Sequence, residues 1–148
     1  MRAIGASTFP ASEIVEAQWV AERRGLERFR TEQPPYSIIN RSIEREVLPV
    51  CQRYGMGTLV WSPLSQGLLT GRHRKGQQTD THRSGNRPEH FGDERKLDVV
   101  EHLIPLAEEA GLPTTHLANR VRESRDRVAQ RACWLGRCAT SYASVLAA

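Results

Sequence analysis

Long apolar runs are missing from this sequence of 148 residues, and none approaches the roughly 18 residues that a membrane-spanning helix requires. The N-terminal Met1-Arg2-Ala3-Ile4-Gly5 lacks the layout of a signal peptide and leads directly into strand-like sequence. The three cysteines, Cys51, Cys133 and Cys138, are an odd number without metal-ligand spacing. These absences argue against membrane-spanning and disulfide-rich secreted proteins and predict a reducing, cytoplasmic compartment.

Lysine is also scarce, with 2 lysines against 19 arginines, a bias that is typical of a GC-rich genome. The formal net charge is +4, from 21 basic and 17 acidic residues. Residues 1–118 contain 15 basic and 15 acidic residues. The whole positive excess therefore lies in residues 119–148, which contain six arginines and two acidic residues. The main body is therefore neutral, and the basic charge does not predict a nucleic-acid partner for it.

Strand and helix signals alternate over the first 112 residues. Strands are predicted at residues 3–7, 29–33 and 58–61, and helices at 11–24, 42–54 and 93–111, with a fourth helix beginning at 113. Strand–helix units repeated every 25–30 residues or so are typical of a parallel sheet. The pattern alone leaves open part of a (β/α)₈ barrel or a small doubly wound sheet. The absence of a G-x-G-x-x-G fingerprint after every strand weighs against a Rossmann nucleotide site.

Capping residues and apolar stripes set the predicted helix ends. Pro10 and Gly25 flank the first helix, because proline opens helices and glycine ends them. Ser42 is predicted to cap the second helix and Asp93 the third. The second helix has an apolar stripe of Ile43, Val47, Val50, Cys51 and Tyr54, and the third has Leu97, Val100, Leu103, Ile104 and Ala107. The polar stretch at 72–92 is predicted to be a mobile surface loop.

Three ordered motifs carry a family resemblance: IGASTF at 4–9, EQPPYS at 32–37 and WSPLSQGLLTGR at 61–72. Together they resemble the second half of the aldo-keto reductase family, in the branch of the potassium-channel β subunits and glyceraldehyde-phosphate-type reductases. The resemblance covers residues 2–118. It implies a partial (β/α)₈ TIM barrel that contributes the fifth to seventh strands, and an oxidoreductase that reduces carbonyls with NADPH.

The resemblance also assigns a nicotinamide site at the strand ends. Ser7 and Gln33 match residues that hydrogen-bond the nicotinamide carboxamide, and Trp61 matches the aromatic residue that stacks on the ring. Thr8 stands where the family usually has Asn, and its hydroxyl lacks the paired donor and acceptor of an amide. Structural roles are the alternatives: Ser7 ends a strand, Gln33 satisfies backbone groups before two prolines, and Trp61 packs at a barrel mouth.

A phosphate-binding segment follows by the same resemblance. Ser62, Pro63, Leu64 and Gly67 match the loop that runs along the cofactor pyrophosphate, and Arg72 matches a basic residue that closes over the phosphates. A solvated role is the alternative for Arg72. No metal site is predicted, because the histidines His73, His82 and His90 have no acidic or cysteine partner at ligand spacing and are expected at the surface.

The family's catalytic set of Asp, Tyr, Lys and His lies on its first four strands, and nothing in this sequence matches it. Tyr36 and Tyr54 have no lysine nearby in sequence, while Lys75 and Lys96 are predicted in a loop and on a helix face. No catalytic residue is therefore assigned. We expect a fragment that is inactive alone and associates with a complementary half or with itself. The alternative is a non-catalytic nucleotide-binding or protein-interaction module.

The Arg-rich tail at 119–148 departs from the family pattern and is predicted to be a divergent segment. A shifted reading frame after residue 118 is one hypothesis for its origin. An RNA- or membrane-binding arm is another alternative, which predicts binding that weakens steeply with salt. The tail lacks a clean amphipathic period and has no interleaved aromatic residues beyond Trp134 and Tyr142, so we expect neither a nucleic-acid nor a membrane partner. No motif in the sequence identifies the carbonyl substrate.

Overall fold

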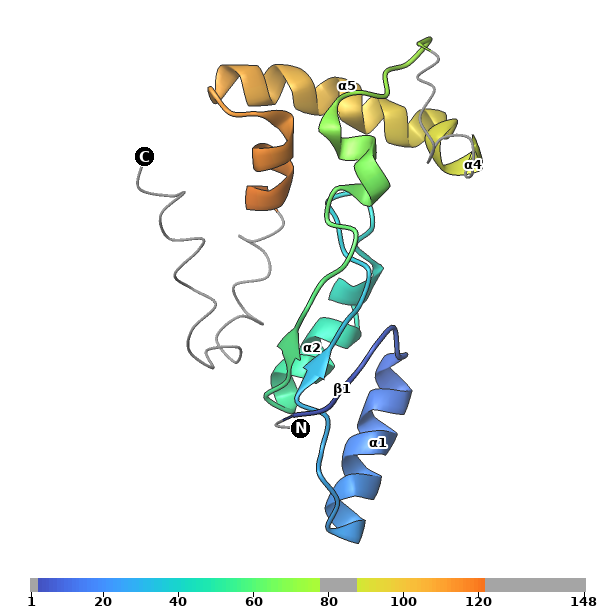
Figure 1. Ribbon diagram of the computed structural model, residues 1–148, viewed down its shortest axis with the longest axis vertical. Helices are drawn as coiled ribbons and strands as arrows, with labels where there is room; N and C mark the ends of the chain where they lie inside the picture. The colour runs from blue at the N-terminus through green and yellow to red at the C-terminus, as the bar shows by residue number, and fades with distance from the viewer. Residues whose placement is uncertain (1–2, 78–87, 122–148) are drawn as a thin grey trace.

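The computed structural model describes residues 3–77 and 88–121, which form an elongated molecule of two lobes (Figure 1). The sheet lobe (residues 3–61) contains β1 (Gly5–Ala6), α1 (Ala11–Arg24), β2 (Thr31–Glu32), the 3₁₀ helix η1 (Ser42–Glu44), α2 (Val47–Arg53) and β3 (Gly57–Thr58). The helical lobe (residues 62–77 and 88–121) contains the 3₁₀ helix η2 (Ser65–Thr70), α4 (Pro88–Phe91), α5 (Glu94–Glu109) and a helical segment at 114–121. None of the helices in these ranges is both long and apolar enough to cross a bilayer.

The three strands form a parallel sheet in the order β1-β2-β3, which confirms the predicted strand direction. Ala6, Glu32 and Thr58 share one row of the register. Backbone hydrogen bonds continue the pairing past the strands, up to a bridge between Pro35 and Trp61. The carboxyl ends of all three strands therefore meet at one end of the sheet.

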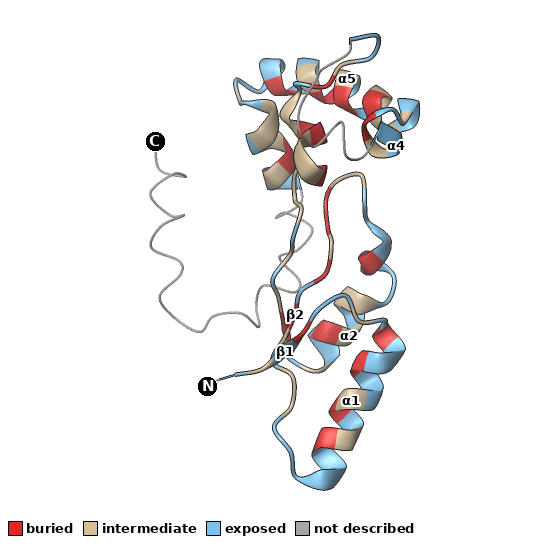
Figure 2. Ribbon diagram, turned by 45° about the vertical axis from the view of Figure 1, so that its right-hand side comes forward, coloured by how far each residue is buried: buried red, intermediate tan, exposed pale blue. Residues whose placement is uncertain are grey.

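The two faces of this sheet differ in what covers them. Successive side chains of a strand point to opposite faces, and Ala6 and Glu32 are buried on the same face as the helices. The core there consists of Ile14 from α1, Cys51 from α2 and Met56, and buried positions mark both helices in Figure 2. The following row, Ser7, Gln33 and Leu59, is exposed. No described residue of the chain covers this second face.

Helix α1 begins and ends where the sequence predicts. Pro10 precedes its first residue, and Gly25 follows its last residue in a left-handed conformation with φ of 66°. Glycine adopts this conformation without the clash that a Cβ atom would cause. The 14-residue helix is thereby fixed at both ends by local chemistry.

The prediction of one continuous second helix capped by Ser42 is wrong. The segment divides into η1 and α2, and the Ser42 hydroxyl donates to Oδ1 of Asn40, 3.2 Å away, instead of capping the helix. Pro49 gives the physical reason, because a proline ring clashes with the carbonyl four residues earlier in a helix. That carbonyl belongs to Arg45, at the break between the two helices.

Helix α5 confirms its predicted cap, since Oδ1 of Asp93 accepts a hydrogen bond of 3.1 Å from the backbone N–H of Arg95. The predicted inward residues of α5 pack in the core of the helical lobe: Leu97, Val100, Leu103 and Ala107 are buried, and Ile104 is half-buried.

The loop prediction for 72–92 is wrong at Pro88–Phe91, which form α4. Its middle part, 78–87, lies outside the described residues.

An ion-pair cluster anchors the beginning of the polar stretch at 72–92 to α5. The guanidinium of Arg74 donates to both carboxylate oxygens of Glu101 at 2.7 and 2.6 Å, and the backbone N–H of Lys75 adds a bond of 3.1 Å. These bonds, with that of Arg74 the largest cause, lower the pKa of Glu101 to about 2. Residues 74 and 75 are therefore anchored, in contrast to the mobile loop that the composition predicts.

Candidate functional site

The ends of β1 and β2 bring the first group of predicted site residues together. The Ser7 hydroxyl donates to the backbone carbonyl of Gln33 at 3.0 Å, and the backbone N–H of Thr8 donates to the same carbonyl at 3.2 Å. Thr8 adopts a left-handed φ of 61°. The side chains of Ser7 and Gln33 are exposed on the uncovered face of the sheet, where a ligand can reach them.

Glu32 supports this turn from the buried face. Its Oε1 accepts a hydrogen bond of 3.1 Å from the backbone N–H of Phe9, while its Oε2 is buried without a hydrogen-bond partner among the described residues. Burial raises the pKa of the Glu32 carboxyl, and the backbone hydrogen bonds from Phe9 and Thr8 offset part of that rise. Glu32 therefore holds the turn that positions Ser7, a role that the sequence pattern alone did not predict.

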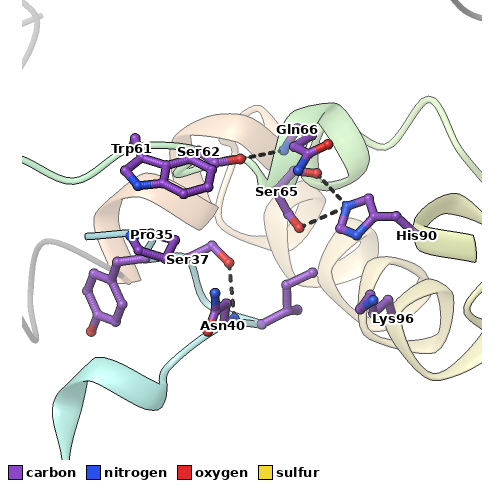
Figure 3. A pocket seen from close by; sticks show the side chains of 11 residues that line it. Pro35, Ser37, Asn40, Trp61, Ser62, Ser65, Gln66, His90 and Lys96 are labelled. Carbon is purple, nitrogen blue, oxygen red and sulfur yellow. Dashed lines mark hydrogen bonds between the residues drawn. The ribbon is translucent and has the colours of Figure 1, made fainter. Parts of the chain in front are cut away.

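A pocket of about 310 Å³ lies beside the strand ends, between the two lobes (Figure 3). The sheet lobe contributes Pro35, Tyr36, Ser37, Ile39, Asn40 and Trp61, and the helical lobe contributes Ser62, Ser65, Gln66, His90 and Lys96. Figure 3 shows Trp61 on one side of the pocket and His90 and Lys96 on the other. The pocket is therefore aromatic at one end and basic at the other.

The pocket wall includes a backbone segment with unusual dihedral angles. Ser62, Ser65 and Gln66 have φ values of 56°, 49° and 60°, in the left-handed region that non-glycine residues rarely adopt. Each such residue costs on the order of 1–3 kcal/mol and persists where the surroundings hold it. Here the Ser62 hydroxyl accepts from the backbone N–H of Gln66 at 2.9 Å. This strained, rigid turn lies where the sequence predicts a phosphate-binding loop.

The two basic side chains of the pocket are held by neighbours in the helical lobe. Nε2 of His90 lies 3.0 Å from the backbone oxygen of Ser65 and 3.3 Å from its hydroxyl. A carbonyl only accepts, so this nitrogen carries the ring proton. Nζ of Lys96 forms an ion pair of 3.0 Å with Oδ2 of Asp93. Asp93 does not line the pocket, so its carboxylate holds the ammonium from outside.

The predicted cofactor residues fall into four groups. Trp61 and Ser62 line the pocket, while Ser7, Thr8 and Gln33 lie together at the strand ends. Three others do not line the pocket: Pro63, Leu64 and Gly67. Of these, Leu64 packs against the core of the helical lobe. Arg72 is exposed after η2 and does not line the pocket.

Two histidines differ from their predicted surface positions. His73 is buried, with its ring centroid 4.4 Å from that of Phe91, and burial lowers its pKa. His90 is half-buried in the pocket wall. His82 lies outside the described residues. No sequence motif predicted that Asn40 or Lys96 would line a pocket, because the pocket joins segments that are distant in the chain.

Comparisons with known proteins agree on one family. Residues 1–128 match the model of the aldo/keto reductase family. The chain is 35% identical over 120 residues to a rice protein named "Probable voltage-gated potassium channel subunit beta", covering 77% of this chain and 37% of that protein. It is 44% identical over 72 residues to the Bacillus subtilis "Uncharacterized oxidoreductase YrpG", covering 49% of this chain and 22% of the relative.

A solved structure of a longer protein is similar in fold to this chain. The glycerol dehydrogenase of Gluconobacter oxydans matches with a TM-score of 0.63 and 21% sequence identity, covering 97% of this chain but 47% of that chain. The chain thus spans less than half the length of each of these three proteins. At this identity the structural match supports the fold and leaves the function to the site itself.

Proposed function

The chain belongs to the aldo/keto reductase family, and on that premise we propose that it binds the nicotinamide end of NADP(H) in the cytoplasm and contributes the cofactor side of a carbonyl reductase. The observation that carries this proposal is that Trp61 lines the pocket and pairs with Pro35, two residues beyond Gln33, whose backbone carbonyl accepts from the Ser7 hydroxyl. An aromatic face beside two polar side chains suits a flat ring that carries an amide.

The polar groups at the strand ends are suited to the nicotinamide carboxamide. The Gln33 side chain offers a donor and an acceptor together, as the carboxamide does. The Ser7 hydroxyl already donates to the backbone of Gln33, so its oxygen remains able to accept from the carboxamide N–H. The Trp61 side chain is 42% exposed, which leaves part of its face open for stacking.

The strained turn at 62–67 would hold the cofactor phosphates next to this ring. When bound, the cofactor supplies the hydride, and this chain's residues orient its ring and exclude water from one side. Arg72 lies beyond the pocket, so a part in binding phosphate would require it to close over the ligand. Its solvated role remains the alternative.

A proton donor for the carbonyl is not found among the described residues. Tyr36 borders the pocket, but its hydroxyl donates to Oε1 of Glu44 at 2.7 Å. The Tyr36 proton is thus directed to the Glu44 carboxylate and not into the pocket. We therefore propose that this chain alone binds the cofactor without reducing carbonyls, as a part of a (β/α)₈ barrel that needs its other half.

The surface of the sheet lobe supports such a partner. Val15 and Trp19 of α1 and Leu26, which follows the helix, are exposed, with 56% of Trp19 and 58% of Leu26 accessible. The outer edge of β1 is unpaired among residues 3–77 and 88–121. A parallel strand with its helix would cover both the edge and the apolar residues. The complementary half of a reductase is the partner that we propose, with self-association as the alternative.

A fluorescence titration with NADPH tests the cofactor proposal, using the wild type, Trp61→Leu and the control Trp19→Leu. Both tryptophans are exposed by more than two fifths, but only Trp61 borders the pocket. Loss of stacking predicts a dissociation constant raised about tenfold or more in Trp61→Leu, since stacking on an aromatic side chain contributes roughly 1–3 kcal/mol. Equal affinities in all three proteins, or no binding to the wild type, would contradict it. Binding without any role in reduction, even with the complementary half present, would favour the nucleotide-binding module.

A further inference from the structure

We propose that Glu32 is a positioning residue for the cofactor: its buried carboxylate holds the turn after β1 in the shape that presents Ser7 to the nicotinamide carboxamide. The inference rests on the proposed function and deepens it, because it assigns a part in binding to a residue that touches no ligand. Glu32 is buried on the covered face of the sheet, while its neighbour Gln33 is exposed on the open face. The covered face thus contains the support for groups that the open face offers to a ligand.

Three successive residues of the turn are anchored to these two residues of the second strand. The Ser7 hydroxyl and the Thr8 N–H both donate to the Gln33 carbonyl, at 3.0 and 3.2 Å. The Phe9 N–H donates to Oε1 of Glu32 at 3.1 Å. A hydrogen bond to an ionised acceptor is roughly twice as strong as one between neutral groups. The bond to Glu32 is therefore the anchor whose strength depends on ionisation.

The turn depends on such an anchor because its middle residue is strained. Thr8 has a φ of 61°, and a left-handed conformation is an outlier for a β-branched residue. Strain of this kind persists only where the surroundings hold it. Without the bond from Phe9 the turn can relax, and the movement of Thr8 carries its neighbour Ser7 with it. The position of the Ser7 hydroxyl therefore depends on Glu32.

Stability alone does not explain why a carboxyl group occupies this place. Glu32 is fully buried, and its Oε2 has no hydrogen-bond partner among residues 3–77 and 88–121. Burial of a charged group with incomplete hydrogen bonding destabilises a fold. Ionisable groups in such surroundings gather at functional sites. The carboxylate thus has a cost in stability and, at the end of this strand, a use in binding.

The surroundings of Glu32 on the covered face are uncharged. Ala6 and Thr58 flank it in the sheet, and the core on this face includes Ile14 and Cys51. A thiol in an apolar core is neutral at neutral pH and below. Burial raises the pKa of Glu32, and backbone hydrogen bonds of the turn offset part of that rise. The charged residues of α1 and α2 are all exposed: Glu13, Glu16, Glu22, Arg23, Arg24 and Arg53.

Protonation of Glu32 should weaken cofactor binding while it favours the fold. The neutral carboxyl accepts from the Phe9 N–H less strongly than the carboxylate does, so it holds the turn less firmly. Affinity should therefore fall as the pH falls through the raised pKa of Glu32. The free energy of unfolding changes in the opposite direction, because the buried charge disappears. A merely structural carboxylate would change stability and leave the affinity of the folded protein unchanged.

Calorimetric titration of the full chain with NADP⁺ between pH 5 and 8 tests this, with Glu32→Gln and the exposed control Glu16→Gln. The ratio of dissociation constants, variant to wild type, cancels the titration of the ligand itself. For Glu32→Gln we expect a ratio of roughly fivefold at pH 8 that falls toward one as the pH falls. For Glu16→Gln the ratio should stay at one. Urea denaturation in the same buffers should show Glu32→Gln gaining stability relative to wild type as the pH rises.

A further variant tests whether the effect passes through Ser7. Ser7→Ala should raise the dissociation constant about fivefold at pH 8, and less at low pH, where the protonated Glu32 no longer holds the hydroxyl in place. This measurement needs no change at Glu32. The double variant Ser7→Ala/Glu32→Gln should bind no more weakly than Ser7→Ala alone. Additive losses would overturn the positioning of Ser7 by Glu32.

The outcomes separate this inference from the function on which it rests. Equal affinities of wild type and Glu32→Gln at every pH, with binding that still depends on Trp61, would overturn the positioning role and keep the cofactor site. A ratio above one that does not change with pH would also overturn it, because the amide would then disturb the site by its shape. Failure of the wild type to bind the cofactor would overturn both proposals.

Discussion

The two lobes of the molecule differ in how their buried apolar residues are grouped. The sheet lobe has a cluster of three fully buried residues, Ile14, Cys51 and Met56. The helical lobe has seven buried residues in its cluster: Leu68, Leu69, Phe91, Leu97, Val100, Leu103 and Ala118. The strands are two residues long, and the sheet is open on one face. Among the described residues each lobe has eight buried apolar side chains, so the lobes differ in arrangement: most of those in the helical lobe form one cluster, while most of those in the sheet lobe lie outside its cluster of three.

The largest expected effect is the loss of a core side chain in the helical lobe. Leu68→Ala removes a fully buried side chain and should lower the free energy of unfolding by about 2–5 kcal/mol, because a cavity remains in the core. Leu106→Ala is the control, since Leu106 is 54% exposed, and should change the free energy by about 0.5 kcal/mol or less. Urea denaturation measures both. Similar losses in the two variants would contradict the packing described for this lobe.

A smaller effect is expected at Glu32 in the sheet lobe. Glu32→Ala leaves the N–H of Phe9 without its acceptor and should lower the free energy of unfolding by about 1–3 kcal/mol. Glu32→Gln keeps an acceptor oxygen and removes the ionisable group. The folded-state pKa of Glu32 is raised above its ordinary 4.5, so the wild type loses stability as the pH rises above that value, through the raised pKa. Glu32→Gln should lack this loss.

Denaturation of wild type and Glu32→Gln at pH 4 to 8 measures this dependence, with Glu16→Gln as a control on the exposed side of α1. The free energy of Glu32→Gln should rise relative to wild type with increasing pH, whereas Glu16→Gln should follow wild type. A parallel course of Glu32→Gln and wild type would show that the burial of this carboxyl has no energetic consequence.

The smallest effect concerns Glu101 in the helical lobe, where the sign is opposite. The folded-state pKa of Glu101 is lowered to about 2 from an ordinary 4.5. Its bonds to Arg74 and Lys75 therefore stabilise the fold above pH 4.5, and this stabilisation is lost as the pH falls from 4.5 toward 2. Glu101→Gln should flatten that part of the acid unfolding curve, recorded by circular dichroism. An unchanged curve would mean that this surface cluster does not contribute to stability.

Local chemistry explains which elements could be predicted from the sequence. Pro10 and Gly25 bound α1, and Asp93 caps α5, because each acts within one turn of its own helix. The break before α2 could have been inferred from Pro49, whose ring excludes a continuous helix through Arg45. The short helix α4 had no such local signal: its residue Phe91 is buried in the core of the helical lobe, so tertiary packing determines it.

The candidate site was predictable only where sequence motifs at neighbouring strand ends carry it. Ser7 and Gln33 follow strands that pair directly, so the resemblance of two motifs sufficed to bring them together. The pocket also needs His90 and Lys96, which are more than 25 residues from Trp61 in sequence. No periodic pattern relates such positions, and their meeting depends on how the helical lobe packs against the strained turn.

Hydrogen–deuterium exchange of the full chain with and without NADPH tests most directly whether one ligand binds between the two lobes. A ligand in the pocket should slow exchange in residues 33–40 and 61 of the sheet lobe together with residues 62–67 and 88–96 of the helical lobe, since these segments surround the pocket. Leu106, on the exposed side of α5, lies in a segment that should keep its exchange rate. Protection confined to one lobe, or unchanged exchange throughout, would contradict a nicotinamide site formed by both.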